Sequence, residues 1–455
     1  MLKKFDLFLN KRALYFLVVA CIVFLGLYLR LNWSLKFYGA GRQWLPDEYY
    51  YYVSTAENAL KGKGFLPAFN DMPFSRGGIF VPAPLQCLFI LAVYYIFGLN
   101  PFIVKIIQIL FSIIAIIFCA EIGRRLVSGF AGIVFAFLFA IYPEFVFWTE
   151  ILQTESNFLS MLVLLLFLLI LWAKEGNTRI ALYASIVLGL LCLQRGNALL
   201  MGPCLAITAL LYFRNKRGIV SAIVFSFFPF CIIAPWLIRN MIVYGEPVII
   251  SSHQGIMLYI SNNIHLKPLQ EPYAEIVNVL EYQNKDYPYL VPEIEEKCRV
   301  YDEKKANICR DLKVSWFAYS RAYNKVFLSY IVQHPVHFIK NLALKTYNQF
   351  WLIQNVTRIA VGFFRSESVF AVLHRGILFG GLMGFIIMLV WLKNRKIYII
   401  TVMFFYFILT GALFLLTLDG RYNLYLKLFL MLYCAGGCSL FFSFAWNKFR
   451  RQLKL

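Results

Sequence analysis

Long hydrophobic runs are the feature that most limits what this chain can fold into. Apolar runs of roughly 17 to 25 residues recur along its 455 residues, and 61% of all residues are hydrophobic. A soluble domain of this size cannot bury so much apolar surface in one core. The sequence therefore predicts an all-α, polytopic membrane protein whose helices cross a bilayer.

The charge of the chain follows the boundaries of these runs. There are 44 Lys and Arg against 23 Asp and Glu, which gives a formal net charge of +21. The basic residues cluster in short stretches between or beside the runs: Lys3-Lys4, Lys11-Arg12, Arg124-Arg125, Arg214 to Arg217, Lys393 to Lys396 and Lys448 to Lys454. Loops of this kind mark the cytoplasmic side of a membrane protein. We therefore attribute the charge to topology and infer no nucleic-acid partner.

Placing the basic loops on the cytoplasmic side predicts about ten crossings, with both termini cytoplasmic. The first run follows basic residues without a small-residue cleavage site, so we interpret it as an uncleaved helix. Short amphipathic helices along the membrane are expected in two outer loops. The predicted parts are a core membrane module at 1–237 that includes the first outer loop at 34–100, an outer loop segment at 238–367, and C-terminal helices at 368–455.

The run at 79–98 conflicts with this topology. Glu48 is predicted on the outer side and Arg124 on the cytoplasmic side, so an odd number of crossings must separate them. Two apolar runs lie between them, 79–98 and 102–121, and only one of them can cross. The first opens with Val81-Pro82-Ala83-Pro84, and prolines suit the start of a juxtamembrane or re-entrant helix. We therefore expect 79–98 not to cross fully, although the sequence leaves this open.

An acidic pair, Asp47-Glu48, follows the first apolar run in an otherwise hydrophobic and basic region. Carboxylates close to a membrane span are costly unless they face water, a cavity or a partner, so they are candidate functional residues. A solvated pair in a loop is the alternative. Glu155 is a second candidate, and the alternative for it is a charge that favours the start of a helix.

Short motifs along most of the chain resemble those of one enzyme family. They occur in the family's order: Asp47-Glu48 with Gly62-Lys63-Gly64-Phe65, Ala83-Pro84-Leu85, Gly123 to Leu126, Gln153-Thr154-Glu155, Leu193-Gln194-Arg195, Ala234 to Asn240 with Gly255 to Tyr259, Tyr330 to Trp351, and Asp419 to Tyr422. The chain resembles the GT-C glycosyltransferases. The greater likeness is to the branch of dolichyl-phosphate-mannose protein mannosyltransferases and lipid A aminoarabinose transferases, in its bacterial form.

This resemblance implies a GT-C membrane fold and a sugar transfer at the outer face of the cytoplasmic (inner) membrane. The donor it implies is a monosaccharide on a polyprenyl phosphate, and the acceptor is a hydroxyl of lipid A, a surface polysaccharide or a protein. The chain departs from the aminoarabinose branch at Pro82, where that branch has a lysine before its Pro-Pro-Leu. The sugar, the acceptor and the oligomeric state stay open.

The site residues implied by the resemblance suit this chemistry. An attacking hydroxyl needs a base, for which we select Asp47, with Glu48 and Glu155 as further catalytic candidates. A departing lipid phosphate needs positive charge, for which we select Arg239, with Arg195 and Arg421 as further candidates. Arginines at helix ends also reach toward lipid headgroups, which is the alternative for these three.

No cofactor is required by the sequence. Asp47 and Glu155 together are compatible with a divalent cation, and no His or Cys spacing indicates zinc. Cys298 and Cys309 lie in the predicted outer segment, where a disulfide needs a turn between them. Two rival functions remain: a transporter or flippase of lipid-linked sugars, and an oligosaccharide ligase or lipid A modifier of another class.

Overall fold

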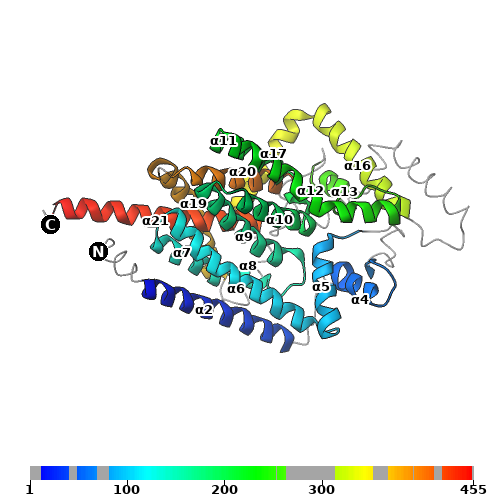
Figure 1. Ribbon diagram of the computed structural model, residues 1–455, viewed down its shortest axis with the longest axis horizontal. Coiled ribbons are helices and arrows are strands. Elements are labelled where there is room, and N and C mark those ends of the chain that lie inside the picture. Colours follow the sequence, from blue (N-terminus) through cyan, green and yellow to red (C-terminus); the bar gives the residue numbers. More distant parts are fainter. Residues whose placement is uncertain are drawn as a thin grey trace, which may run out of the picture.

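The computed structural model describes residues 12–39, 49–68, 81–252, 254–262, 313–351, 367–392, 394–414 and 423–452. Within these ranges the chain forms helices joined by turns and short loops, and it contains no strand. Most of the long helices run along the long axis of the molecule (Figure 1). The prediction of an all-α protein is therefore confirmed.

The helices have the following bounds in chain order: α2 Arg12–Gly39, η1 Tyr49–Val53, α4 Ser54–Leu60, α5 Pro84–Phe97, α6 Pro101–Leu126, α7 Gly129–Ile141, α8 Pro143–Phe147, α9 Thr154–Glu175, α10 Thr178–Gln194, η4 Gly196–Ala198, α11 Met201–Phe213, α12 Lys216–Tyr244, α13 Gln254–Ser261, α16 Lys313–Gln333, α17 Pro335–Trp351, α19 Glu367–Trp391, α20 Lys396–Phe414 and α21 Leu424–Gln452.

Eight segments of the described chain are long and apolar enough to cross a membrane. The apolar helices α7 and α10 are shorter, with 13 and 17 residues, so the count of about ten crossings stays a prediction. Helix α5 has 14 residues, which is about 21 Å and less than the roughly 30 Å of a bilayer core. It also lies across the direction of α6 (Figure 1), as expected of a segment that does not cross.

The loops rich in Lys and Arg gather at one end of the bundle, where α2 begins and α21 ends (Figure 1). The Asn394 side chain donates a 3.2 Å hydrogen bond to the Leu126 carbonyl and so joins two of these loops. Arg217 joins two others, because its Nη1 lies 3.3 Å from the position that a Cβ would take on Gly176. We call this the basic end, and the end where α2 stops and α9 begins the site end. The predicted clustering of basic loops on one side agrees with this arrangement.

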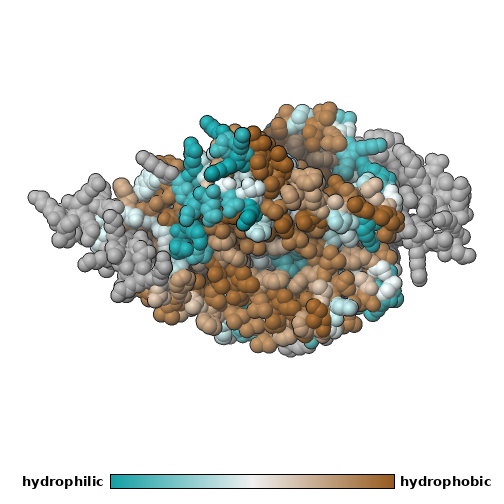
Figure 2. Space-filling model, in the orientation of Figure 1, coloured by the Kyte–Doolittle hydropathy of each residue, from teal (hydrophilic) through white to brown (hydrophobic). Residues whose placement is uncertain are grey.

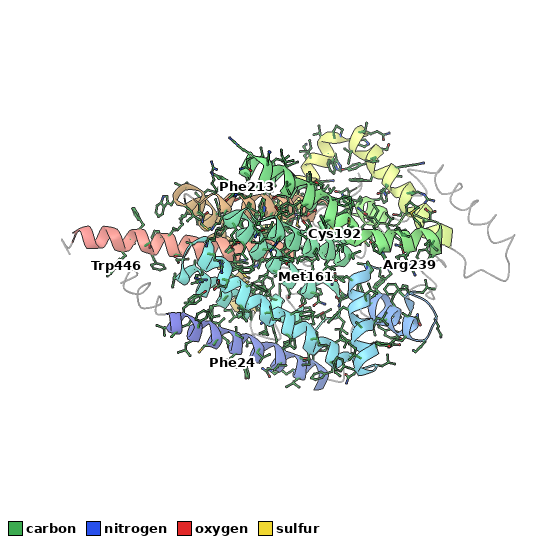
Figure 3. All side chains as sticks on the ribbon, viewed as in Figure 1. Phe24, Met161, Cys192, Phe213, Arg239 and Trp446 are labelled. Atoms are coloured by element: carbon green, nitrogen blue, oxygen red, sulfur yellow. The ribbon has the colours of Figure 1, made fainter. Side chains whose placement is uncertain are left out.

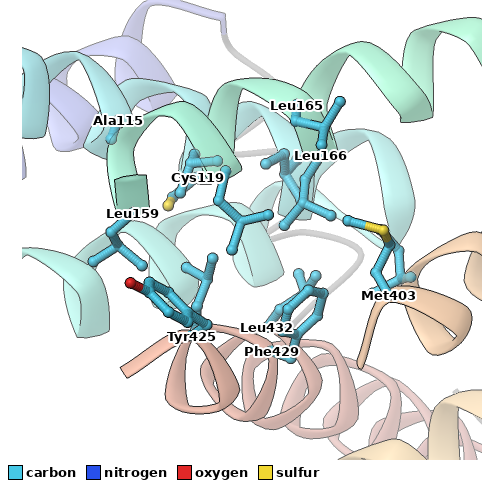
Figure 4. Close-up of a cluster of buried hydrophobic side chains, with 14 of the residues drawn as sticks. Ala115, Cys119, Leu159, Leu165, Leu166, Met403, Tyr425, Phe429 and Leu432 are labelled. Carbon is cyan, nitrogen blue, oxygen red and sulfur yellow. The ribbon is translucent and has the colours of Figure 1, made fainter. Parts of the chain in front are cut away.

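Helices approach one another closely through small residues. A Cβ on Gly123 of α6 would lie 2.6 Å from the Gly132 Cα of α7, so only glycine allows this contact. Gly384 and Gly437 bring α19 and α21 together in the same way. Larger apolar side chains from α6, α9, α20 and α21 fill the core (Figure 4). Others face outward, such as Phe24 on α2 (Figure 3), and hydrophobic residues cover much of the surface (Figure 2).

Helix α12 differs from its predicted bounds. The predicted core module ended at residue 237, but α12 continues without a break to Tyr244. It contains Pro229 and Pro235, and it ends at Gly245, whose φ of 69° is left-handed. The boundary predicted at residue 237 therefore falls inside the helix, because the polar pair Arg239-Asn240 does not end the helix and apolar residues follow it from Met241 to Tyr244.

Beyond α12, helices α13, α16 and α17 belong to the predicted outer segment. The buried Lys345 of α17 donates hydrogen bonds to the Ser261 carbonyl and, over 2.9 Å, to Asn262 Oδ1 at the end of α13. The Asn262 amide donates over 2.7 Å to the Leu413 carbonyl of α20. These hydrogen bonds connect α17 and the end of α13 to α20 of the bundle. Burial lowers the pKa of Lys345 to about 7.

Stability is therefore expected to rise with pH through this lysine. The pKa of Lys345 is depressed in the folded state, so the unfolded chain binds more protons between about pH 7 and its ordinary value near 10.5. A neutral amine keeps two N–H donors, enough for both acceptors. Between pH 7 and 9 the wild type should gain about 2 kcal/mol over Lys345→Met, seen as a rising difference in melting temperature in detergent. Parallel pH curves for the two proteins would contradict this.

Candidate functional site

A fully buried loop joins α7 to α9 at the site end. All residues from Tyr142 to Ser160 are buried, which is unusual for a loop between helices. Pro143 starts the single turn α8, and α9 then begins at Thr154 with Glu155 in its first turn. A buried loop needs internal partners for its polar groups. Those partners include side chains of α5, α6, α10, α19 and α21.

Glu155 and Arg195 form the central contact. Arg195 ends α10 at the bend predicted from the sequence, and its Nη1 donates to Glu155 Oε1 over 2.7 Å. The side chains are 14% and 3% exposed, so this pair is largely removed from water. The structure thus brings together a residue predicted as catalytic and one predicted to bind phosphate. Arg195 thus occupies one of the two carboxylate oxygens of Glu155.

Tyr425 completes this contact from the start of α21. The same Arg195 Nη1 donates to Tyr425 Oη over 3.1 Å, and the guanidinium carbon lies 5.8 Å from the tyrosine ring centroid. The ring packs at 4.5 Å from Phe158 and 5.4 Å from Phe407, between centroids. Figure 4 shows Tyr425 beside the apolar core. The sequence analysis did not select this tyrosine, because an aromatic residue opening an apolar helix carries no signal of its own.

A chain of buried amides lies behind the Glu155–Arg195 pair. Gln86, in the first turn of α5, accepts hydrogen bonds at Oε1 from Asn157 over 3.0 Å and from Gln194 over 2.7 Å. Gln194 precedes Arg195 and also donates to the Thr154 carbonyl, next to Glu155. Gln86 therefore joins α5 to both members of the ion pair through their neighbours.

Two further buried ion pairs hold the same loop. Lys105 of α6 pairs with Glu150, and Lys427 of α21 pairs with Glu144. All four side chains are at most 6% exposed. Burial raises the pKa of Glu150, against the opposing effect of Lys105. Each carboxylate of the loop and of the α9 start is thus neutralised by a base from a different helix.

The sequence analysis missed these four residues, although a signal was present. A charged side chain within or beside an apolar run is costly, and Lys105, Glu144, Glu150 and Lys427 all stand in such places. Which base pairs with which acid depends on the packing of the helices. That part could not be predicted from spacing.

Arg239 lies at the site end of α12 (Figure 3). Its guanidinium carbon lies 4.7 Å from the Tyr244 ring centroid, 5.0 Å from that of Trp236 and 5.9 Å from that of Phe65. One Nη1 donor bonds Asn240 Oδ1 over 2.9 Å. Within the described ranges no carboxylate pairs with Arg239, and no contact joins it to Glu155.

Several predicted site residues lie outside the described residues: Asp47, Glu48, Arg421, Cys298 and Cys309. Their predicted roles, and the predicted approach of Asp47 to Glu155, stay predictions. No group of three metal-ligating side chains occurs in the described part of the chain. A divalent cation at Glu155 would compete with Arg195 for Oε1. The described residues therefore do not by themselves fit a metal, and no step below uses one.

Comparisons with known proteins agree with the family predicted from the motifs. Residues 81–238 match the family model described as dolichyl-phosphate-mannose-protein mannosyltransferase. That range contains α5 to α11 and most of α12, with the Glu155–Arg195 pair and its amide network. No curated protein matches the chain.

Among solved structures, the archaeal oligosaccharyltransferase AglB of Archaeoglobus fulgidus is similar. In its complex with an inhibitory peptide and a dolichol-phosphate it is 15% identical over 97% of this chain and 52% of its own, with a TM-score of 0.56. Its apo form gives a TM-score of 0.55 at 15% identity, over 98% and 52% of the two chains. The chain has the GT-C fold. It spans about half the length of the AglB structures.

ArnT of Cupriavidus metallidurans is also similar, at 11% identity over 94% of this chain and 76% of its own, with a TM-score of 0.35. The family match covers residues 81–238, and the similarity to AglB extends the GT-C fold over nearly the whole chain.

Proposed function

We propose that this GT-C protein transfers a monosaccharide from a polyprenyl-phosphate carrier to an acceptor hydroxyl at the outer face of the cytoplasmic membrane. The observation that carries the proposal is the buried Glu155–Arg195 pair at the site end, inside the region matched to the mannosyltransferase family. AglB was solved with a dolichol-phosphate, which supports a lipid phosphate as the carrier group.

In this proposal Asp47 is the general base. The attacking hydroxyl must lose its proton as it bonds to the anomeric carbon, and a carboxylate within hydrogen-bond reach can accept it. Glu155 is less suited to this step, because Arg195 already holds its Oε1. Glu155 then orients the Arg195 guanidinium, and Glu48 is a further catalytic candidate beside Asp47.

Arg239 is the first candidate for the phosphate of the carrier. The bond from the anomeric carbon to the phosphate oxygen breaks, so negative charge grows on the phosphate and a nearby guanidinium stabilises it. Arg239 has no carboxylate partner within the described residues, and three aromatic rings surround it. Its remaining N–H donors suit two phosphate oxygens. Arg195 and Arg421 are the further candidates.

The acceptor is proposed to be a glycolipid or a polysaccharide in preference to a protein. If the source is bacterial, as the motif resemblance implies, the carrier is undecaprenyl phosphate. Its long apolar tail suits a site beside membrane-facing helices.

Asp47→Asn tests the proposal against a transporter of lipid-linked sugars. We expect membranes with Asp47→Asn to insert the protein normally and to lose sugar transfer by at least about 100-fold, because the base is gone. Glu57→Gln is the matched control. Glu57 lies in the same predicted outer loop and, among the described residues, forms an ion pair with the exposed Lys61 alone, so its loss should leave transfer unchanged.

Transfer by Asp47→Asn at the wild-type rate would contradict the assigned base. An equal loss in Glu57→Gln would show that any charge change in this loop disturbs the protein, and it would remove the support for Asp47.

A further inference from the structure

The basic end of the bundle carries a concentrated positive charge that the proposed reaction does not use. Within the described residues, the loops that meet there hold nine basic side chains: Arg124, Arg125, Lys174, Arg179, Arg214, Lys216, Arg217, Arg395 and Lys396. The acidic side chains beside them are Glu121 and Glu175. Like charges held close together repel, so such a cluster is more stable with an anion bound.

Three of these bases converge on the end of α9. Lys174 lies in the last turn of α9. Arg217 Nη1 approaches Gly176, two residues after Lys174, and would lie 3.3 Å from a Cβ at that position. Lys396, at the start of α20, interacts electrostatically with Lys174 and Arg125. Loops distant in the sequence therefore bring Arg217 and Lys396 each near the end of α9.

The available carboxylates do not neutralise this group. Glu121 is already shared by Arg124, at 2.7 Å, and Arg125, at 3.0 Å. No ion pair in the described part of the chain joins Lys174, Arg217 or Lys396 to a carboxylate. The α9 C-terminus contributes only about half a negative charge. The three bases therefore carry an excess of positive charge, and one of them, Lys396, is half-buried.

The surface beside this group is apolar. Leu211 of α11 and Ile219 and Ile223 of α12 are 65%, 55% and 60% exposed, and they lie in segments that can cross the membrane. Figure 2 shows a hydrophilic area near α11 next to hydrophobic surface. A ligand with both an anionic head and apolar chains fits this border better than a soluble anion does.

We propose that Lys174, Arg217 and Lys396 form a binding site for the phosphate of an anionic phospholipid in the leaflet at the basic end. The phosphodiester oxygens accept charge-assisted hydrogen bonds from the three bases, and an acyl chain lies along Leu211, Ile219 and Ile223. The site is separate from the proposed transfer site, so it holds whether or not the protein transfers a sugar.

The test uses the purified full chain in a neutral detergent. The melting temperature is measured with added phosphatidylglycerol and with phosphatidylcholine of the same chain length. We expect phosphatidylglycerol to raise it by several degrees more than phosphatidylcholine, and 0.5 M salt to reduce the difference. The triple variant Lys174→Gln/Arg217→Gln/Lys396→Gln should lose most of the difference. Lys61→Gln, an exposed base in the first outer loop, is the matched control and should keep it.

An equal response to both lipids, or an undiminished response in the triple variant, would overturn the proposal. An equal rise with inorganic pyrophosphate would also overturn it, because a soluble anion would then suffice. If the triple variant does not fold, native mass spectrometry of the exposed Lys174→Gln decides. Fewer retained phosphatidylglycerol molecules than in wild type support the site, and an unchanged number overturns it.

Discussion

Arg195→Met is expected to be among the most damaging single changes in this protein. It leaves Glu155 as a buried carboxylate without its base, which costs about 3–5 kcal/mol of folding free energy. It also removes the link between α10 and Tyr425 of α21. Thermal unfolding in detergent, together with sugar transfer measured well below the melting temperature, reports both effects.

A double variant separates stability from function at this pair. Glu155→Gln with Arg195→Met removes both charges, so most of the stability should return. Sugar transfer should stay at least about 100-fold below wild type if the guanidinium takes part in the reaction. Arg179→Met, an exposed arginine at the basic end, is the control and should change neither quantity. An Arg195→Met protein as stable as this control would contradict the account.

Lys427→Met is expected to destabilise the protein by a similar amount for a different reason. It leaves Glu144 buried and unpaired, again at about 3–5 kcal/mol. Glu144 lies in the loop that leads to Glu155, and among the described residues neither Glu144 nor Lys427 forms an ion pair with Glu155, Arg195 or Arg239. Replacing both partners, as Lys427→Met/Glu144→Leu, removes the buried charge and should restore most of the melting temperature.

The contrast between the two pairs is the informative result. For the Lys427–Glu144 pair the double variant should regain sugar transfer along with stability, because we assign it a structural role. For the Arg195–Glu155 pair stability should return without transfer. If the Lys427/Glu144 double variant were as unstable as the sum of its single variants, the ion pair would not be what holds this loop.

The general architecture could be predicted because membrane burial leaves a strong pattern in the sequence. The long apolar runs indicated the spans, and the polar Gln194-Arg195-Gly196-Asn197 indicated the bend between α10 and α11 that the structure has. The end of α12 was less predictable. The polar pair Arg239-Asn240 interrupts the apolar run, but the helix ends only at Gly245.

The candidate site was predicted only in part. Glu155 and Arg195 were selected as separate residues, and nothing in their spacing showed that they pair across α9 and α10. Gln86 was missed beside the motif Ala83-Pro84-Leu85, since a neutral amide changes hydropathy little. Its importance comes from the amides that three other helices bring to it. Tertiary contacts of this kind are not encoded locally.

Donor consumption by the purified wild-type protein tests the central claim most directly. The protein is incubated with a panel of monosaccharides on polyprenyl phosphate, and with the same sugars on nucleoside diphosphates, in the presence of glycolipid acceptors. The account predicts that at least one polyprenyl-phosphate sugar is consumed with release of polyprenyl phosphate, and that Asp47→Asn abolishes the reaction. Consumption of nucleotide sugars alone would contradict it.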